Sequence, residues 1–270
     1  MSITRRCLHA IVTTGTNPIG DSRLFTPPER INILGASVID ICFDVRSDSG
    51  GRDPDCASPT LRRYHKTLWS KPLPSGELFS LDESLNDVYL FHRSELGEYF
   101  LSSDSIIHTY SKWKRMQHIV GRVPQEELND FLALAHTVGG YLVFPCNKVN
   151  GLHTINQERG RNKFINDRID LTLECIRLFY NAEESPMTDT LERYTSFFSL
   201  FCNFKGYCEF FLLQDLVSDD FSCVNFFLPF LGFELNPLPK DLDEYSLYRR
   251  HNITLVLGRN KRISDLSQAA

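Results

Sequence analysis

Four aspartates, Asp44, Asp48, Asp53 and Asp55, lie in or beside a short segment rich in glycine and proline. Carboxylate oxygens are the ligands that hard cations such as Mg²⁺ prefer. Asp44 with Asp53 or Asp55 could share one ion if the glycines fold the segment back. We take these three as candidate metal ligands and catalytic carboxylates, and Arg46 as a ligand-binding candidate. In the alternative interpretation, the aspartates only form turns and cap helices.

A basic segment follows at residues 62–71. An arginine pair suits bidentate recognition of phosphate, and a nearby tryptophan offers a stacking surface for a nucleobase. His65 is a candidate general base, provided that its helix borders a cleft. The alternative is an amphipathic helix with a solvated basic face and a core histidine. The ligand-binding candidates here are Arg62, Arg63, Trp69 and Lys71.

The third candidate segment, residues 147–161, is expected to leave a strand, turn through Asn150-Gly151 and enter a helix. That geometry directs backbone N–H groups at an anion. Neither a phosphate-binding Gly-x-x-x-x-Gly-Lys-Ser/Thr loop nor a dinucleotide fingerprint occurs, so functional and structural interpretations stay equally open. The side-chain candidates are Asn147, Asn156, Arg159 and Arg161.

The elements that must position these groups indicate an α+β fold. The mixed sheet carries packed helices, with a strand-richer N-terminal half and a helix-richer C-terminal half. We expect residues 1–35 to form an extension and 36–270 one domain. The expected strands span 38–45, 77–81, 88–92, 98–101, 141–144 and 224–230. Helices are expected from Ser58, from Ser103 or Asp104 to about 118, over 125–137, from about Thr154, after Ser185-Pro186 and from Asp241, with 207–217 undecided but leaning to helix.

Composition narrows the function classes. Of 270 residues, 42% are apolar, which is ample for a core, and the net charge of −5 argues against indiscriminate nucleic-acid binding. Eight cysteines without a Cys-x-x-Cys pair favour a reducing, cytoplasmic location. We expect no membrane span and no signal peptide. Signatures of zinc hydrolases, α/β-hydrolases and kinases do not occur.

Several segments carry a resemblance to a known family. They are Phe43 to Asp48, Ser58 to His65, Thr154 to Gly160 and Asp167 to Arg177. In these segments the chain resembles a bacterial family known only as a domain of unknown function, from about residue 36 onward. The resemblance implies a bacterial, cytosolic protein and one domain. It implies no reaction and no catalytic residues.

Two function classes follow. The first is a cytosolic protein that binds a phosphate-bearing ligand, nucleotide or nucleic acid, at a cleft formed by the three polar segments, with Mg²⁺ as cofactor if it is an enzyme. The second is a non-catalytic interaction protein, in which the aromatic-rich residues 197–233 serve a partner or a homo-oligomer. A small-molecule enzyme of another type is the third alternative.

Overall fold

The computed structural model describes residues 39–83, 90–95 and 97–269. The description concerns the unit formed by residues 35–270, referred to below as the second unit of the chain. The extension expected over residues 1–35 lies outside the described residues. No helix within the described ranges is long and apolar enough to cross a membrane.

The second unit has an α+β fold, as predicted. Its main sheet is antiparallel in the order β3-β4-β5-β6, and β1 and β2 form a separate hairpin. The strands are β1 (Lys71–Pro72), β2 (Leu78–Phe79), β3 (Asp82–Glu83), β4 (Leu90–Ser94), β5 (Gly97–Ser105) and β6 (Tyr141–Pro145).

Helices account for most of the remaining chain, and α10 is the longest of those described. They are α1 (Pro54–Ala57), α2 (Pro59–Trp69), α3 (Gln117–Val120), α4 (Gln125–Ala135), α5 (Ile155–Arg161), α6 (Ile169–Tyr180), α7 (Thr188–Glu192), α8 (Thr195–Ser199), α9 (Phe204–Phe210) and α10 (Leu242–Ala269). Short 3-10 helices, η2 to η5, occupy Val45–Asp48, Lys114–Met116, Val138–Gly140 and Gln214–Leu216.

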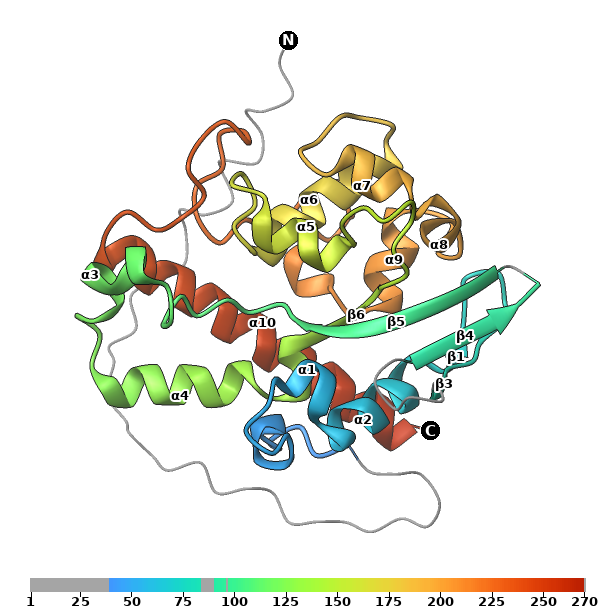
Figure 1. The fold of residues 1–270 in the computed structure, drawn as a ribbon, viewed down its shortest axis with the longest axis horizontal. Coiled ribbons are helices and arrows are strands. Elements are labelled where there is room, and N and C mark those ends of the chain that lie inside the picture. Colours follow the sequence, from blue (N-terminus) through green and yellow to red (C-terminus); the bar gives the residue numbers. More distant parts are fainter. Residues whose placement is uncertain (1–38, 84–89, 96, 270) are drawn as a thin grey trace. The chain divides into compact units, whose positions relative to one another are not determined.

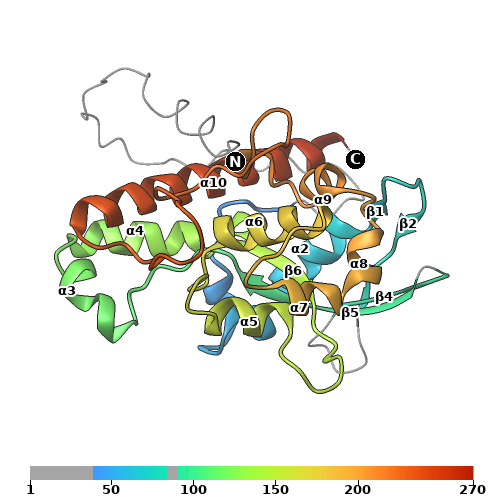
Figure 2. The same ribbon diagram turned by 90° about the horizontal axis from the view of Figure 1, so that it is seen from above.

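The core lies around β6 and the long helix α10. Every residue of β6 is buried, and Figures 1 and 2 show α10 running beside α4. Arg259 of α10 is fully buried and donates to the backbone oxygens of Gly139, Tyr141 and Phe211. One side chain therefore ties α10 to the start of β6 and to the segment after α9.

Helix α2 forms as the sequence predicts. The Ser58 hydroxyl accepts a hydrogen bond from the Leu61 backbone N–H, and Pro59 occupies the first turn. The helix buries one face, which comprises Leu61, Tyr64, His65, Leu68 and Trp69. The amphipathic pattern thus identified the helix and its buried face.

Three element predictions are wrong. Residues 39–44 form turns instead of a strand, because Asp40 and Asp44 accept local backbone hydrogen bonds that compete with sheet pairing. The expected helix from residue 103 is absent because β5 continues to Ser105, paired with β6. The expected strand 224–230 is reduced to a single bridge between Val217 and Val224.

Candidate functional site

An aspartate cluster, defined as Asp53, Asp55, Asp104 and Asp167, forms where α1 meets β5. Asp53 caps α1 and its carboxylate accepts a hydrogen bond from the Asp55 backbone N–H. The carboxyl groups of Asp55 and Asp104 lie close enough to interact directly, since each shifts the pKa of the other. Two segments about 50 residues apart in the chain thus bring carboxyl groups close together.

These two carboxyl groups have unusual protonation. Burial, followed by the charges of Asp104 and Asp53, raises the pKa of Asp55 to about 8. Burial also raises the pKa of Asp104 to about 7, although the nearby Arg159 guanidinium opposes this. Two carboxyl groups that interact this strongly cannot both ionise readily, and their raised pKa values favour one proton shared by the pair near neutral pH.

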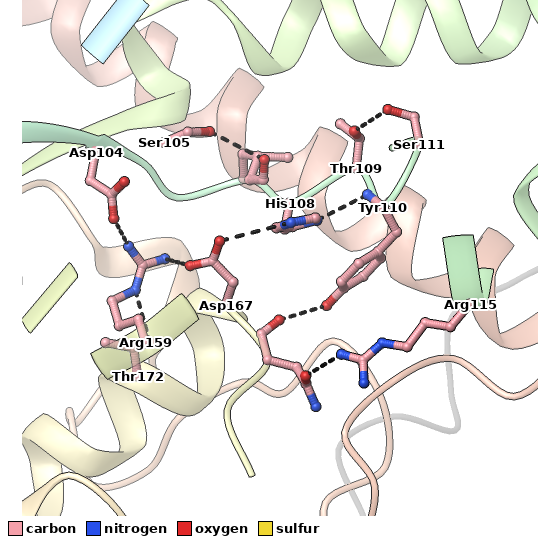
Figure 3. Close-up of polar contacts among 12 residues, drawn as sticks. Asp104, Ser105, His108, Thr109, Tyr110, Ser111, Arg115, Arg159, Asp167 and Thr172 are labelled. Carbon is pink, nitrogen blue, oxygen red and sulfur yellow. Dashed lines mark hydrogen bonds and ion pairs between the residues drawn. The ribbon is translucent and has the colours of Figure 1, made fainter. Parts of the chain in front are cut away.

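Arg159 lies against the cluster from α5, on the other side of β5 from α1 (Figure 1). Its side chain is 0% exposed and is ion-paired with Asp104 and, at 3.3 Å between Nη2 and Oδ1, with Asp167. Nε donates to the Thr172 hydroxyl over 3.2 Å. Figure 3 shows the guanidinium between the two aspartates. Arg159 therefore fixes both carboxylates while leaving each side chain about a quarter exposed, 22% for Asp104 and 24% for Asp167.

A second polar contact also joins α5 to β5. Asn156 lies three residues before Arg159, hence on the same face of α5, and donates to the Ser102 hydroxyl over 3.1 Å. Ser102 precedes Asp104 by two residues, hence on the same face of β5. The Asn156 Oδ1 atom is buried without a hydrogen-bond partner. An acceptor is thus available beside the cluster.

His108 lies beside Asp167 and completes the site. The Nε2 atom of His108 lies 3.9 Å from Asp167 Oδ2, and its ring stacks on that of Tyr110 at 4.5 Å between centroids (Figure 3). Burial lowers the pKa of His108, although Asp167 opposes this. Asn166 and Asp167 both adopt positive φ, 46° and 64°, which directs the Asp167 carboxylate toward Arg159. His108 Nδ1 accepts a hydrogen bond from the Tyr110 backbone N–H over 3.0 Å, so the neutral ring carries its hydrogen on Nε2, which faces Asp167.

The structure brings together part of the predicted site. Asp53, Asp55, Asn156 and Arg159 meet around Asp104, from two of the three predicted segments. Arg62, from the remaining segment, donates to the Cys56 backbone oxygen over 3.3 Å. The charges of Asp53, Asp55 and Asp104 raise the pKa of Cys56 in addition to burial, and Arg62 opposes them. Arg62 therefore lies at the edge of the aspartate cluster.

The other candidates lie elsewhere or are engaged in structural contacts. His65 is buried between Ser103 and Trp69, and burial lowers its pKa to about 3, so it is neutral at physiological pH. Hydrogen bonds from Arg46 hold the pKa of Asp44 below its ordinary value, although burial opposes this. The remaining contacts are Arg63 over the Tyr64 ring, the Asn147 side chain with the Phe100 N–H, Arg161 with His153, and Trp69 and Lys71 with Phe210.

The sequence did not identify Asp104 and Asp167 as residues of the site. Asp104 was considered only as a helix cap, because the polar run from Ser102 to Ser105 resembles a helix start. Asp167 lies within a segment that carries the family resemblance, but no role was attached to it. The signal that could have identified Asp104 is its place after the alternating residues Tyr99 and Leu101, which continue as β5.

The cluster is not a complete metal cage. No group of three or more His, Cys, Asp or Glu side chains within the described ranges is arranged to hold a metal ion. A separate polar cavity of 610 Å³ lies between the loop before α5 and the segment around α7; its lining includes His153, Glu158 and Arg193. The cluster thus offers two adjoining carboxyl groups, a fixed arginine and a neutral histidine.

Comparison with known proteins identifies a family whose function is unknown. A model described as "Family of unknown function (DUF6994)" matches residues 39–263. No curated protein and no solved structure matches the chain.

Proposed function

Since the chain belongs to this family of unknown function, which supplies no reaction, we propose a function from its own residues. The protein binds a phosphate-bearing ligand, a nucleotide or a nucleic acid, through Mg²⁺ held by Asp55 and Asp104. The observation that supports this most is the close approach of these two carboxyl groups beside the buried Arg159.

Electrostatics make a cation the necessary link. Two aspartates pair with the buried Arg159 and two more lie close by, so a phosphate approaching them without a cation would be repelled. A divalent ion would replace the shared proton and relieve the repulsion between Asp55 and Asp104. Mg²⁺ commonly binds through one or two carboxylates, water molecules and substrate phosphates instead of a full protein cage. Two carboxyl groups close together therefore suit Mg²⁺ with a phosphate ligand.

The residues at the rim would then recognise the ligand. Arg62 is partly exposed and forms its hydrogen bond with a backbone carbonyl, so its remaining N–H groups can contact a phosphate. The unpartnered Asn156 Oδ1 can accept from a base or a hydroxyl group.

The test is binding of Mg²⁺ and a magnesium nucleotide to the full chain, measured by calorimetry. Mg²⁺ binding at pH 7 should release protons, detected as an enthalpy that changes with the ionisation enthalpy of the buffer. A nucleotide should bind in the presence of Mg²⁺ and not in EDTA. Nucleotide affinity that is the same with and without Mg²⁺ would contradict the proposal.

A second candidate function rests on the surface near residues 221–235. The aromatic segment of α8 and α9 is largely core, with Phe197, Phe198 and Phe201 fully buried. The later loop instead exposes Leu231 by 73% and Leu235 by 53%. This favours a self-association surface there. Sedimentation of Leu231→Ser beside the wild type tests self-association as the alternative to ligand binding, since only a dimer that uses this loop would dissociate.

A further inference from the structure

A cavity of 400 Å³ lies between β1 and α9, formed by other residues than the aspartate cluster. Its walls include the apolar residues Leu73, Pro74, Phe201 and Phe210. The polar groups on the wall include Lys71, Lys205 and Glu209. Apolar walls with a few polar groups are typical of small-molecule sites.

Lys71 differs from the other lysine of this cavity in its surroundings. Its Nζ donates to the Phe210 backbone oxygen over 2.5 Å and lies 4.5 Å from the centre of the Phe210 ring and 5.1 Å from that of Trp69. Among the ion pairs of the described residues, none includes Lys71, whereas Lys205 pairs with Glu209 at 3.7 Å. The Lys71 amine therefore lies among aromatic rings without a carboxylate to stabilise its charge.

We propose that Lys71 is a nucleophilic amine that forms an imine with an aldehyde or ketone whose apolar body occupies this cavity. The site needs three properties, and the structure has each of them. The amine lines a cavity, its hydrogen-bond partner is a neutral carbonyl, and apolar walls can hold the carbon skeleton of the ligand.

Protonation supports the same assignment. Burial, together with the charge of Arg259, lowers the pKa of Lys71 to about 8. A lysine in water has a pKa of about 10.4, so at pH 7 Lys71 has more than about 100 times the usual fraction of neutral amine. Desolvation in an apolar pocket is an established way to activate a lysine for carbonyl chemistry.

The chemical step is balanced without a further reagent. The neutral nitrogen attacks the carbonyl carbon, and one proton passes from that nitrogen to the carbonyl oxygen to give a carbinolamine. Loss of the hydroxyl group, with the second hydrogen from nitrogen, then gives the imine and one water molecule. No electron is gained or lost overall.

The test uses the full chain with hexanal and cyanoborohydride, which reduces an imine to a stable secondary amine by donating hydride. Peptide mapping then gives the rate of modification at each lysine. Lys71 should react at least about tenfold faster than Lys205 at pH 7, since its neutral fraction is far higher. Its rate should reach half of its maximum near the pKa of about 8.

Two variants serve as matched controls. Lys261→Arg changes an exposed lysine of α10 that does not line the cavity and should leave labelling of Lys71 unchanged. Lys71→Arg should remove the fast phase, with circular dichroism confirming the fold. Equal rates at Lys71 and Lys205 in the wild type, a measurement that needs no variant, would overturn the assignment.

Discussion

The Asp104→Asn variant tests the proposed cation site at a single residue. The amide keeps the shape and can still accept a hydrogen bond from protonated Asp55, but it removes one anionic ligand. We expect Mg²⁺ affinity to fall by about tenfold or more, the scale usual for altered metal sites. Calorimetry measures the affinity. Asp130→Asn, on the exposed face of α4, is the control and should bind as the wild type does.

The second prediction for a single residue concerns Arg159. Removing one partner of a buried ion pair leaves uncompensated charge, which destabilises a fold by about 3–5 kcal/mol. Arg159→Met should therefore lower the free energy of unfolding by that amount, measured by urea denaturation at pH 7. Arg161→Met, two residues on and exposed, should change it by less than about 0.5 kcal/mol. Equal effects would show that Arg159 does not organise the cluster.

Single residues also mark how far the site could be read from the sequence. Asp53, Asp55 and Arg159 were selected for their chemistry, and the fold brings them together. Their shared neighbour, Asp104, was not selected: the alternation of Tyr99 and Leu101 places it on a strand, but does not show that it meets α1 and α5. What joins them is the packing of α1 and α5 against β5, which is a long-range property.

At the scale of elements, the predictions succeeded where the signal was local. Helix α2 was identified by its Ser58-Pro59 start and its apolar spacing. β5 was only partly identified, because its polar end at residues 102–105 is a strand through pairing with β6, about 40 residues later. Residues 39–44 failed in the opposite direction, since alternation suggested a strand but local aspartate hydrogen bonds form turns. A pairing partner decided the first case and local side-chain hydrogen bonds decided the second.

Glycine substitutions test the packing of two elements. A Cβ atom at Gly139 of η4 would collide with the Asn260 side chain and lie 2.9 Å from the Val256 backbone oxygen, both in α10. Gly139→Ala should therefore destabilise the fold by about 1–3 kcal/mol, as overpacking does. Gly160→Ala in α5 meets open space and should stabilise it by up to about 1 kcal/mol through helix propensity. Urea denaturation measures both, and a tolerated Gly139→Ala would contradict the described contact.

At the scale of the whole molecule, buried titratable groups change the stability of the fold with pH in opposite directions. His65, whose pKa is lowered to about 3, is neutral in the fold, so stability falls as the pH drops below its unfolded value of about 6.5. Burial lowers the pKa of His108 and His136 as well, which adds to the loss in acid. The aspartate pair acts in the other direction, because a raised carboxyl pKa means that the fold binds more protons than the unfolded chain.

The last prediction concerns the pH range in which the aspartate pair outweighs the other buried groups. Between about pH 7 and 8 the buried His65, His108 and His136 are neutral in the fold and mostly neutral in the unfolded chain, whereas Asp104 loses its proton in the fold near pH 7 and Asp55 near pH 8. Stability arising from the raised pKa of the aspartates is complete below the unfolded value and is lost as the pH rises through the folded one. Lys71, whose pKa is lowered to about 8, opposes this loss only toward the upper end of the range. The wild type should therefore become less stable from about pH 7 to 8 in urea titrations.

Two further titrations connect this slope to the site. Asp55→Asn stays uncharged, so its stability should change much less over the same range. Asp189→Asn, near the separate polar cavity, should keep the wild-type slope. Millimolar Mg²⁺ should flatten the wild-type slope, because an ion bound only by the folded state stabilises it most where the pair is ionised. A slope that persists in Asp55→Asn would place the coupled protons elsewhere, and the cation proposal would lose its electrostatic basis.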